Sequence, residues 1–148
     1  MKLLTSLLAG LAGAIVLNVI HESVKRLDPE APRVDLVGEE ALTKTIEAVG
    51  GSAPEGNALY AATLAGDLVS NALYFSMIGG GKKKYLLLRG VGYGLAAGIG
   101  ALKLTKPMGL NDAPVNRTKK TQIMTVAWYL IGGITTAATL KALQKKSC

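Results

Sequence analysis

Three long apolar stretches decide what this chain can fold into. Residues 3–20 and 121–140 carry no charged side chain, and residues 85–102 carry only Arg89. A helix rises about 1.5 Å per residue, so each stretch is long enough to cross most of the roughly 30 Å hydrocarbon core of a bilayer. The sequence therefore predicts membrane-spanning helices, with no room left for a separate soluble domain.

A fourth stretch, residues 58–78, is as long as the others but carries Asp67 at its middle. A central Asp costs about 2.5–3.5 kcal/mol on membrane-insertion scales, whereas each Leu, Ile, Phe or Val returns about 0.3–0.6 kcal/mol. The large apolar residues of this stretch nearly cancel the cost of Asp67, so the helix needs protein neighbours to shelter the carboxyl group. We expect Asp67 to face the interior of the bundle and to be protonated at neutral pH.

These stretches predict an all-α polytopic membrane protein, a four-transmembrane-helix bundle that forms a single domain over residues 1–148. The expected spans cover about residues 3–21, 58–78, 85–104 and 121–141. The short, basic turn after residue 78 makes neighbouring spans antiparallel, which places both termini on one side of the membrane.

The loop after the first span predicts an amphipathic helix over about residues 35–49. Pro29 and Pro32 end the preceding helix, and apolar residues then recur at helical spacing. We expect Asp35 to cap this helix and Gly50-Gly51 to end it. The residues expected to dock it on the bundle are Val37, Leu42 and Ile46.

The net charge of +7 indicates a membrane surface more than a nucleic acid. The basic residues flank the apolar stretches, where they meet anionic headgroups, and aromatic residues do not interleave with them as base stacking would require. The expected partners are the lipid bilayer and a further copy of this chain or another subunit of a membrane complex, with no nucleic acid. Basic residues divide almost evenly between the two sides of the membrane. We expect a protein of a bacterial inner membrane, with both termini in the cytoplasm.

Glycine spacing predicts close packing of the third span. Gly90, Gly94 and Gly98 recur every four residues, which lets another backbone approach one face of the helix. We expect the second span to be that neighbour. The run from Gly92 to Ala97 matches the sequence pattern of a dinucleotide-binding motif. That motif requires a preceding strand, which is absent here, so we expect no dinucleotide site.

Two polar groups are candidate functional sites. An intramembrane site is expected around Asp67, with Asn71 and Tyr129 as its hydrogen-bond partners. Its full set is Asp67, Asn71, Tyr74, Tyr129 and Arg89. A site at the membrane edge comprises Asn18, His21 and Glu22, either as an interfacial pair in water or with a metal or proton-relay role. By helical rise, about 15–20 Å of depth separates His21 and Glu22 from Asp67.

Enzyme chemistry has no positive signal in the chain. No HExxH, CxxC or GxSxG motif is present, and the single cysteine, Cys148, allows neither an internal disulfide nor a zinc cluster. We therefore expect no enzyme activity, no cofactor and no metal.

Two functions remain as alternatives. The first is proton- or cation-linked passage of a small solute through the polar site around Asp67, because a carboxyl group in mid-membrane is costly to keep. The second is a non-catalytic helical subunit or homo-oligomeric assembly protein, because small residues recur at four-residue spacing on the spans.

The segment APRVDLVGEEAL, residues 31–42, resembles uncharacterised bacterial inner-membrane proteins of the YagU type. Those proteins place a Pro-Arg pair and an Asp at similar positions after their first helix, where this chain has Pro32-Arg33 and Asp35. The resemblance implies an inner-membrane location and carries no function or site residue.

Overall fold

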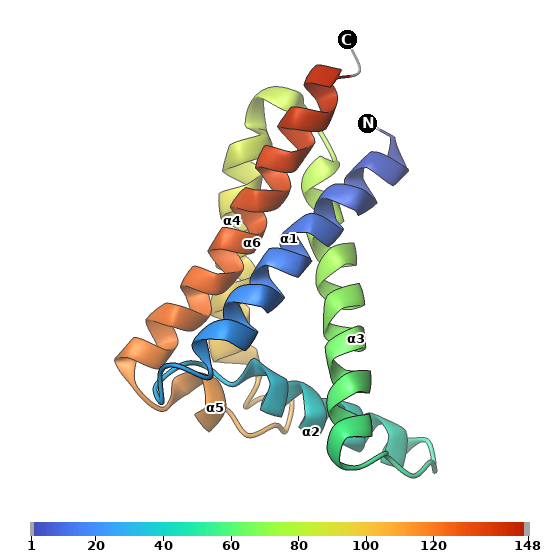
Figure 1. Ribbon diagram of the computed structural model, residues 1–148, viewed down its shortest axis with the longest axis vertical. Coiled ribbons are helices and arrows are strands. Elements are labelled where there is room, and N and C mark those ends of the chain that lie inside the picture. Colours follow the sequence, from blue (N-terminus) through green and yellow to red (C-terminus); the bar gives the residue numbers. More distant parts are fainter. Residues whose placement is uncertain (1, 147–148) are drawn as a thin grey trace.

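The computed structural model describes residues 2–146, so Cys148 lies outside the described residues, and within this range all regular structure is helical. The predicted all-α class is confirmed. The long helices are α1 (Leu3–Val24), α3 (Gly56–Ser76), α4 (Leu86–Leu104) and α6 (Lys119–Lys146). Figure 1 shows both ends of the chain at the same end of the molecule as the turn between α3 and α4. That turn contains two short 3₁₀ helices, η1 (Met77–Gly79) and η2 (Lys83–Tyr85).

Three helical segments of the described chain are long and apolar enough to cross a membrane. They are Leu3–Val24, Lys83–Leu104 and Lys119–Lys146. The helix α3 has 21 residues, yet it is not among the three, because Asp67 and the polar residues around it lower its hydropathy. The hydropathy of α3 therefore does not by itself make this helix a span.

The helix α4 packs against α6, and the expected packing against the second span is wrong. A Cβ atom on Gly94 would lie 2.7 Å from Cα of Leu130, and one on Gly98 would lie 2.7 Å from Cα of Val126. A Cβ atom on Gly90 would likewise lie 2.7 Å from the carbonyl oxygen of Gly133. The three glycines do bring two backbones together, as their spacing predicts, but the neighbour is the last helix of the chain.

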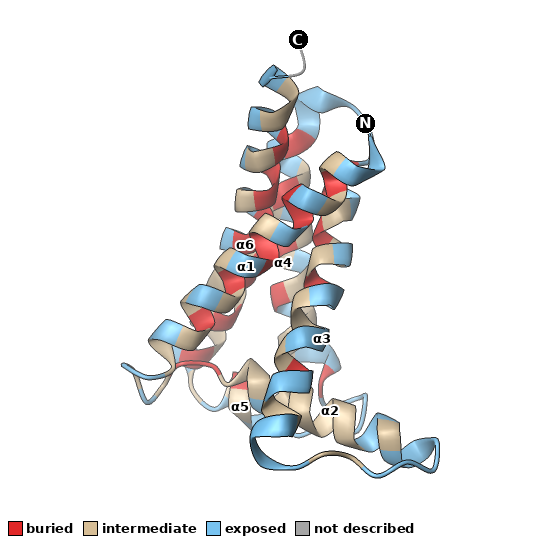
Figure 2. Cartoon of the chain, turned by 45° about the vertical axis from the view of Figure 1, so that its right-hand side comes forward, coloured by how far each residue is buried: buried red, intermediate tan, exposed pale blue. Residues whose placement is uncertain are grey.

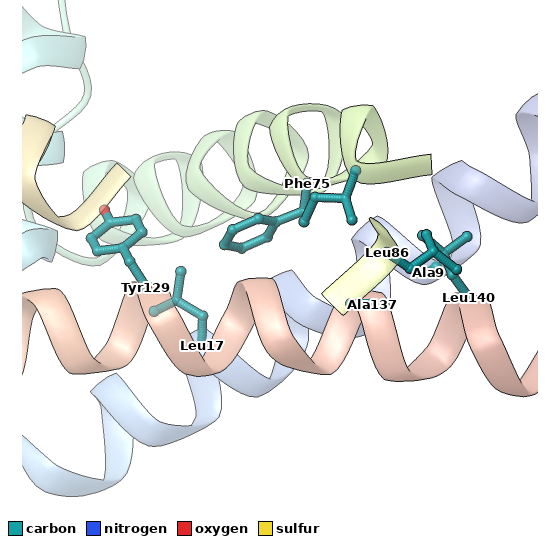
Figure 3. Close-up of a cluster of buried hydrophobic side chains, with 8 residues drawn as sticks. Ala9, Leu17, Phe75, Leu86, Tyr129, Ala137 and Leu140 are labelled. Carbon is teal, nitrogen blue, oxygen red and sulfur yellow. The ribbon is translucent and has the colours of Figure 1, made fainter. Parts of the chain in front are cut away.

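The helix α1 lies between α3 and α6 and packs against both. Its small residues make this possible, since a Cβ atom on Gly10 would collide with the backbone of Ala72, and one on Gly13 with Thr136. Leu17, Phe75 and Leu140 lie in the apolar core between these helices (Figure 3). Figure 2 shows that burial concentrates along these contacts and thins out at the end where α2 lies.

The helix α3 leans away from α4 toward the end of the molecule opposite the termini (Figure 1). A groove of about 460 Å³, the α3–α4 groove, lies in the resulting space. Asn71 and Tyr74 line it from α3, Ala97 and Ala101 from α4, and Tyr129 from α6. The four long helices therefore do not close into a uniformly packed bundle.

The predicted loop helix is α2 (Val34–Ala48), and it lies across the end of the bundle with the short helix α5 (Ala113–Asn116) (Figure 1). Gly50 ends it with a φ of 83°, which favours glycine. Asp35 is not its cap as expected: Arg33 occupies the N-cap, and Asp35 lies in the first turn.

Polar contacts hold much of α2, because none of its residues is buried. Lys44 donates a hydrogen bond to the Gly109 carbonyl at 2.6 Å, and Glu40 accepts one from the Asn111 amide at 2.9 Å. Of the expected docking residues, Val37 and Leu42 line grooves against the bundle. Ile46 instead lies against Gly51 of its own loop.

Candidate functional site

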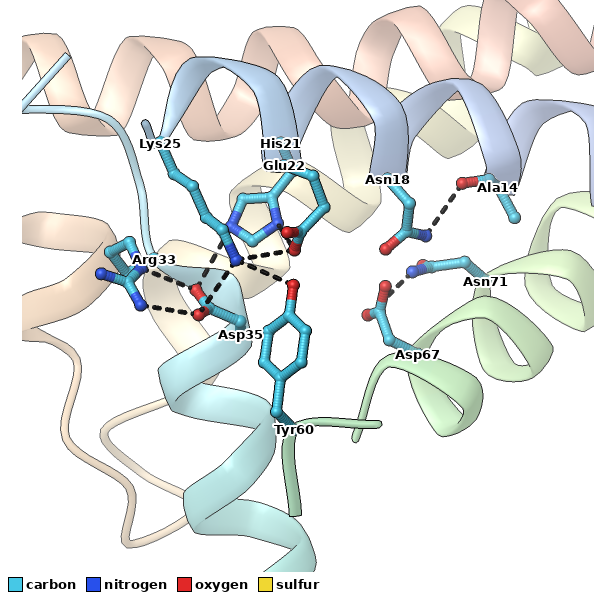
Figure 4. A network of polar contacts seen from close by, with 10 residues as sticks. All are labelled: Ala14, Asn18, His21, Glu22, Lys25, Arg33, Asp35, Tyr60, Asp67 and Asn71. Atoms are coloured by element: carbon cyan, nitrogen blue, oxygen red, sulfur yellow. Dashed lines mark hydrogen bonds and ion pairs between the residues drawn. The ribbon is translucent and has the colours of Figure 1, made fainter. Parts of the chain in front are cut away.

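A cluster of polar residues joins the last turns of α1 to the first turn of α2 and the first half of α3 (Figure 4). On α1, helical spacing of three or four residues puts Asn18, His21 and Lys25 on one face. Asp35 approaches this face from α2, and Tyr60, Thr63 and Asp67 approach it from α3. The cluster is therefore assembled from three segments that are far apart in the sequence.

Asp35 is the centre of the charged half of the cluster. Arg33 donates two hydrogen bonds to its carboxylate, from Nε to Oδ1 at 2.9 Å and from Nη2 to Oδ2 at 2.8 Å. Lys25 Nζ lies 3.5 Å from Oδ2, and His21 Nε2 lies 3.4 Å from Oδ1. Burial alone would raise the pKa of the Asp35 carboxyl group, but the His21 ring and the charges of Arg33 and Lys25 hold it well below its usual range.

Lys25 links α1 to α3. Its ammonium group lies 2.8 Å from Glu22 Oε1 and donates a hydrogen bond to the Tyr60 hydroxyl group at 3.0 Å. Burial lowers the pKa of Lys25, but its hydrogen bonds to Glu22 and Tyr60 and the charge of Asp35 outweigh this and raise it overall. Lys25 is therefore charged, and together with Arg33 it balances Glu22 and Asp35.

Asp67 lies in the half of the cluster that has no Lys or Arg. Asn71 Nδ2 donates a hydrogen bond to its Oδ1 at 3.0 Å, so this predicted partner is confirmed. Asn18, whose Nδ2 donates to the Ala14 carbonyl at 2.9 Å, points its side chain toward Asp67 (Figure 4). Among the described residues no hydrogen bond joins Asp67 to Tyr129, which instead lines the α3–α4 groove with Asn71.

The remaining members of the predicted intramembrane site lie elsewhere. The Tyr74 hydroxyl group donates to the Tyr93 carbonyl at 2.8 Å. Arg89 donates to the carbonyls of Ile78 and Lys82 at 2.8 and 2.9 Å, so it closes the turn between α3 and α4. The structure therefore separates Arg89 from Asp67.

The two predicted sites are in fact one. Asn18, His21, Glu22 and Asp67 line a single cavity, so the expected depth difference of about 15–20 Å between them is wrong. That difference came from treating neighbouring helices as parallel, whereas α1 crosses α3 at an evident angle (Figure 1). The crossing brings Asn18 to the cavity that Asp67 lines.

Five members of the cluster are not among the predicted site residues: Lys25, Arg33, Asp35, Tyr60 and Thr63. One available signal was the stripe on the second predicted span, where Tyr60 and Thr63 share a helix face with Asp67. Arg33 and Asp35 gave no such signal, because their positions depend on how the loop after α1 folds back.

Asp67 and Thr63 separate two hollows of different kinds. On one side is a small cavity of about 30 Å³, the His21 cavity, which His21, Asp35 and Tyr60 also line. On the other side is an open groove of about 290 Å³ between α2 and α3, the α2–α3 groove. Its other lining residues are small or uncharged: Gly38, Ala41, Leu42, Thr45, Ala62, Gly66 and Ser70.

Comparison with protein families, with curated proteins and with solved structures finds no match for this chain. The resemblance of residues 31–42 to YagU-type proteins stays a prediction. Within residues 2–146 no group of three or more His, Cys, Asp or Glu side chains is arranged to hold a metal ion. The site must therefore be interpreted from its own geometry.

Asp35→Asn is expected to release α2 while the four long helices stay folded. Removing one partner of a buried ion pair costs about 3 kcal/mol or more, and the Asp35 side chain is only 7 % exposed. We expect amide exchange in residues 34–48 to rise at least tenfold, measured by mass spectrometry in detergent or lipid. Glu47→Gln, an exposed carboxyl on the same helix, is the control and should change little.

The same anchor has a defined pH dependence. Because the pKa of Asp35 is lowered in the folded protein, its contribution is fully present above the ordinary Asp value of about 3.9 and is lost only as the pH falls well below it. After correction for intrinsic exchange, protection of α2 in the wild type should not change between pH 8 and pH 5. A loss of protection over that range would contradict the assignment of Asp35 as the anchor.

Proposed function

We propose that this chain is an integral protein of a bacterial inner membrane, with α3 as a fourth span and with both termini in the cytoplasm. In this proposal the carboxyl group of Asp67 exchanges a proton as a cation or small solute passes. The observation that carries it is the position of Asp67 between a buried polar cavity and an open groove.

The exposed surface supports α3 as a span. Its large outward side chains, Val69 and Leu73, are 58 % and 55 % exposed, whereas Thr63 and Asn71 are buried against the rest of the protein. On α1 the large exposed side chains are likewise apolar, among them Leu8, Ile15 and Val19. An apolar outer face with polar groups turned inward is the arrangement that a bilayer favours.

The surroundings of Asp67 suit reversible protonation. Neither Lys nor Arg lines the His21 cavity or the α2–α3 groove, as far as the described residues go. The carboxyl group therefore has no permanent cation beside it to fix its charge. The groove gives protons and small solutes a route to the carboxyl group, and Asn71 holds it in place by a hydrogen bond.

The alternative function is that of a non-catalytic subunit or a homo-oligomer. The observation that favours it is a second hollow between α3 and α4, of about 370 Å³, lined by Tyr74, Leu88, Gly92 and Tyr93 among others. Gly92 has no atom within 4 Å of the place a Cβ would occupy. A small residue facing open space on an apolar helix is a place where another helix can pack.

Gly66→Leu is expected to block access to Asp67 without damaging the fold. Gly66 lines the α2–α3 groove, and nothing lies within 4 Å of its Cβ position, so a leucine side chain fits and fills the groove. In proteoliposomes with an internal pH-sensitive dye, we expect proton flux to fall at least tenfold. The melting temperature should not fall, because leucine favours a helix over glycine by up to about 1 kcal/mol.

Gly92→Leu is the matched control, since it makes the same change at an open glycine far from the groove. Under the transport proposal Gly92→Leu keeps its flux. If the wild type instead shows no more flux than empty vesicles and Gly92→Leu breaks an oligomer, the assembly alternative is correct.

A further inference from the structure

Two polar atoms in the His21 cavity have no hydrogen-bond partner in the part of the chain that the structure describes. They are Nε2 of His21 and Oγ1 of Thr63, and their residues are only 6 % and 7 % exposed. Both residues line the cavity, together with Asn18 and Asp67. Buried polar atoms are almost always hydrogen-bonded, to protein or to an ordered water molecule.

The size of the cavity limits what could satisfy these atoms. A water molecule needs about 10–15 Å³ of such space and two to four polar partners. The cavity offers about 30 Å³, which is room for one water molecule or two and too little for an organic solute. Its polar lining supplies the partners.

We propose that the His21 cavity binds a water molecule held by Thr63 Oγ1, and that this water connects the carboxyl group of Asp67 to Nε2 of His21. Thr63 is a positioning residue in this arrangement, and His21 is a second proton carrier. The relay rests on the proposed proton exchange at Asp67, whereas the water site itself rests on the cavity and its two buried atoms.

The geometry around His21 suits a proton acceptor. Nδ1 lies 3.6 Å from Oε1 of Glu22, and this carboxylate favours the ring tautomer that carries its proton on Nδ1. Nε2 lies 3.4 Å from Oδ1 of Asp35 but makes no aligned hydrogen bond to it, so this nitrogen is available to the water. Both oxygens of Asp35 already accept hydrogen bonds from Arg33, so Asp35 does not need the ring as a donor.

The transfer balances within the cavity. The O–H bond of the Asp67 carboxyl group breaks, the water takes that proton, and the water releases one of its own protons to Nε2. The products are the Asp67 carboxylate and the His21 imidazolium, whose new N–H points back at the water. The return transfer restores both groups. The charged and titratable groups that face this path are Glu22 and Lys25 from α1, Arg33 and Asp35 from the start of α2, and Tyr60 from α3.

The single histidine of the chain allows a direct test. With ¹⁵N-histidine in the full-length protein in lipid, solid-state NMR measures magnetisation transfer from water to the ring nitrogens of His21. We expect clear transfer in the wild type and in Thr63→Ser, which keeps the hydroxyl group. Thr63→Val has the same shape without the hydroxyl group, and we expect its transfer to fall at least fivefold.

Proton flux in the same variants tests the relay. Thr63→Val should slow flux about tenfold, and Thr63→Ser should stay within about twofold of the wild type. No transfer in the wild type, or undiminished transfer in Thr63→Val, overturns the water site. If Thr63→Val does not fold, the wild type and Thr63→Ser still decide the matter, because both must show transfer.

The two proposals fail in different ways. If Asp67→Asn keeps normal flux while water transfer to His21 depends on Thr63, the transport proposal is wrong and the water site stands. If Asp67→Asn abolishes flux while Thr63→Val leaves transfer unchanged, the water site is wrong and proton exchange at Asp67 stands.

Discussion

Asp67→Asn is expected to reduce proton flux in proteoliposomes to the level of empty vesicles, while the protein keeps its fold. The amide has the shape of the carboxyl group and can still accept the hydrogen bond that Asn71 donates at 3.0 Å, but it cannot release or bind a proton near neutral pH. The measurement is the quenching of an internal pH dye after a pH jump. Glu47→Gln removes an exposed carboxyl group, and its proton flux should equal that of the wild type.

The opposite result would decide against transport. Wild-type flux in Asp67→Asn would mean that the carboxyl group only holds helices together. Asp67→Leu tests the structural role of the carboxyl group alone, because it leaves the Asn71 amide without its acceptor. We expect this loss of a hydrogen bond to cost about 1–3 kcal/mol of stability, whichever function is correct.

Of the substitutions proposed for this protein, Gly94→Leu is expected to lower the stability of the fold most. Even the first carbon of the new side chain would lie 2.7 Å from Cα of Leu130 and 2.8 Å from the Tyr129 carbonyl oxygen. Backbone atoms cannot swing aside as a flexible side chain can, so α4 and α6 must separate. Overpacking costs about 1–3 kcal/mol in a well-packed core, and we expect at least the upper end here, seen as a lower melting temperature in detergent.

Gly92→Leu provides the control on the same helix. It gains the same helix propensity, and nothing lies within 4 Å of its Cβ position. Its melting temperature should equal or exceed that of the wild type. Equal melting temperatures for the Gly92 and Gly94 variants would show that α4 does not pack on α6 in the membrane.

The helical architecture could be predicted because it depends on local patterns. Long, mostly apolar stretches indicated the four long helices, and Gly50 indicated the end of α2. The glycines of α4 indicated a close contact but not its partner, because spacing describes one face of one helix. Gly133 and the neighbouring small residues of α6 make the matching face, and only the fold shows that the two meet.

Only part of the polar cluster could be predicted from the sequence. Asp67 and Asn71 are four residues apart on one helix, so their hydrogen bond follows from helical geometry. The meeting of Asp67 with His21 depends on the crossing of α1 and α3, which no spacing encodes. The role of Asp35 depends on a loop that folds back onto α1, and its chemistry alone equally suited a helix cap.

The packing of α1 on α3 also bears on how the protein is made. Both helices precede residue 77, so the ribosome has completed them before it begins α4. Asn18, His21 and Asp67, with the Asp35 loop between them, belong to this first half of the chain. Under the proposed membrane insertion, α3 can thus meet its polar partners on α1 before the last two helices are made.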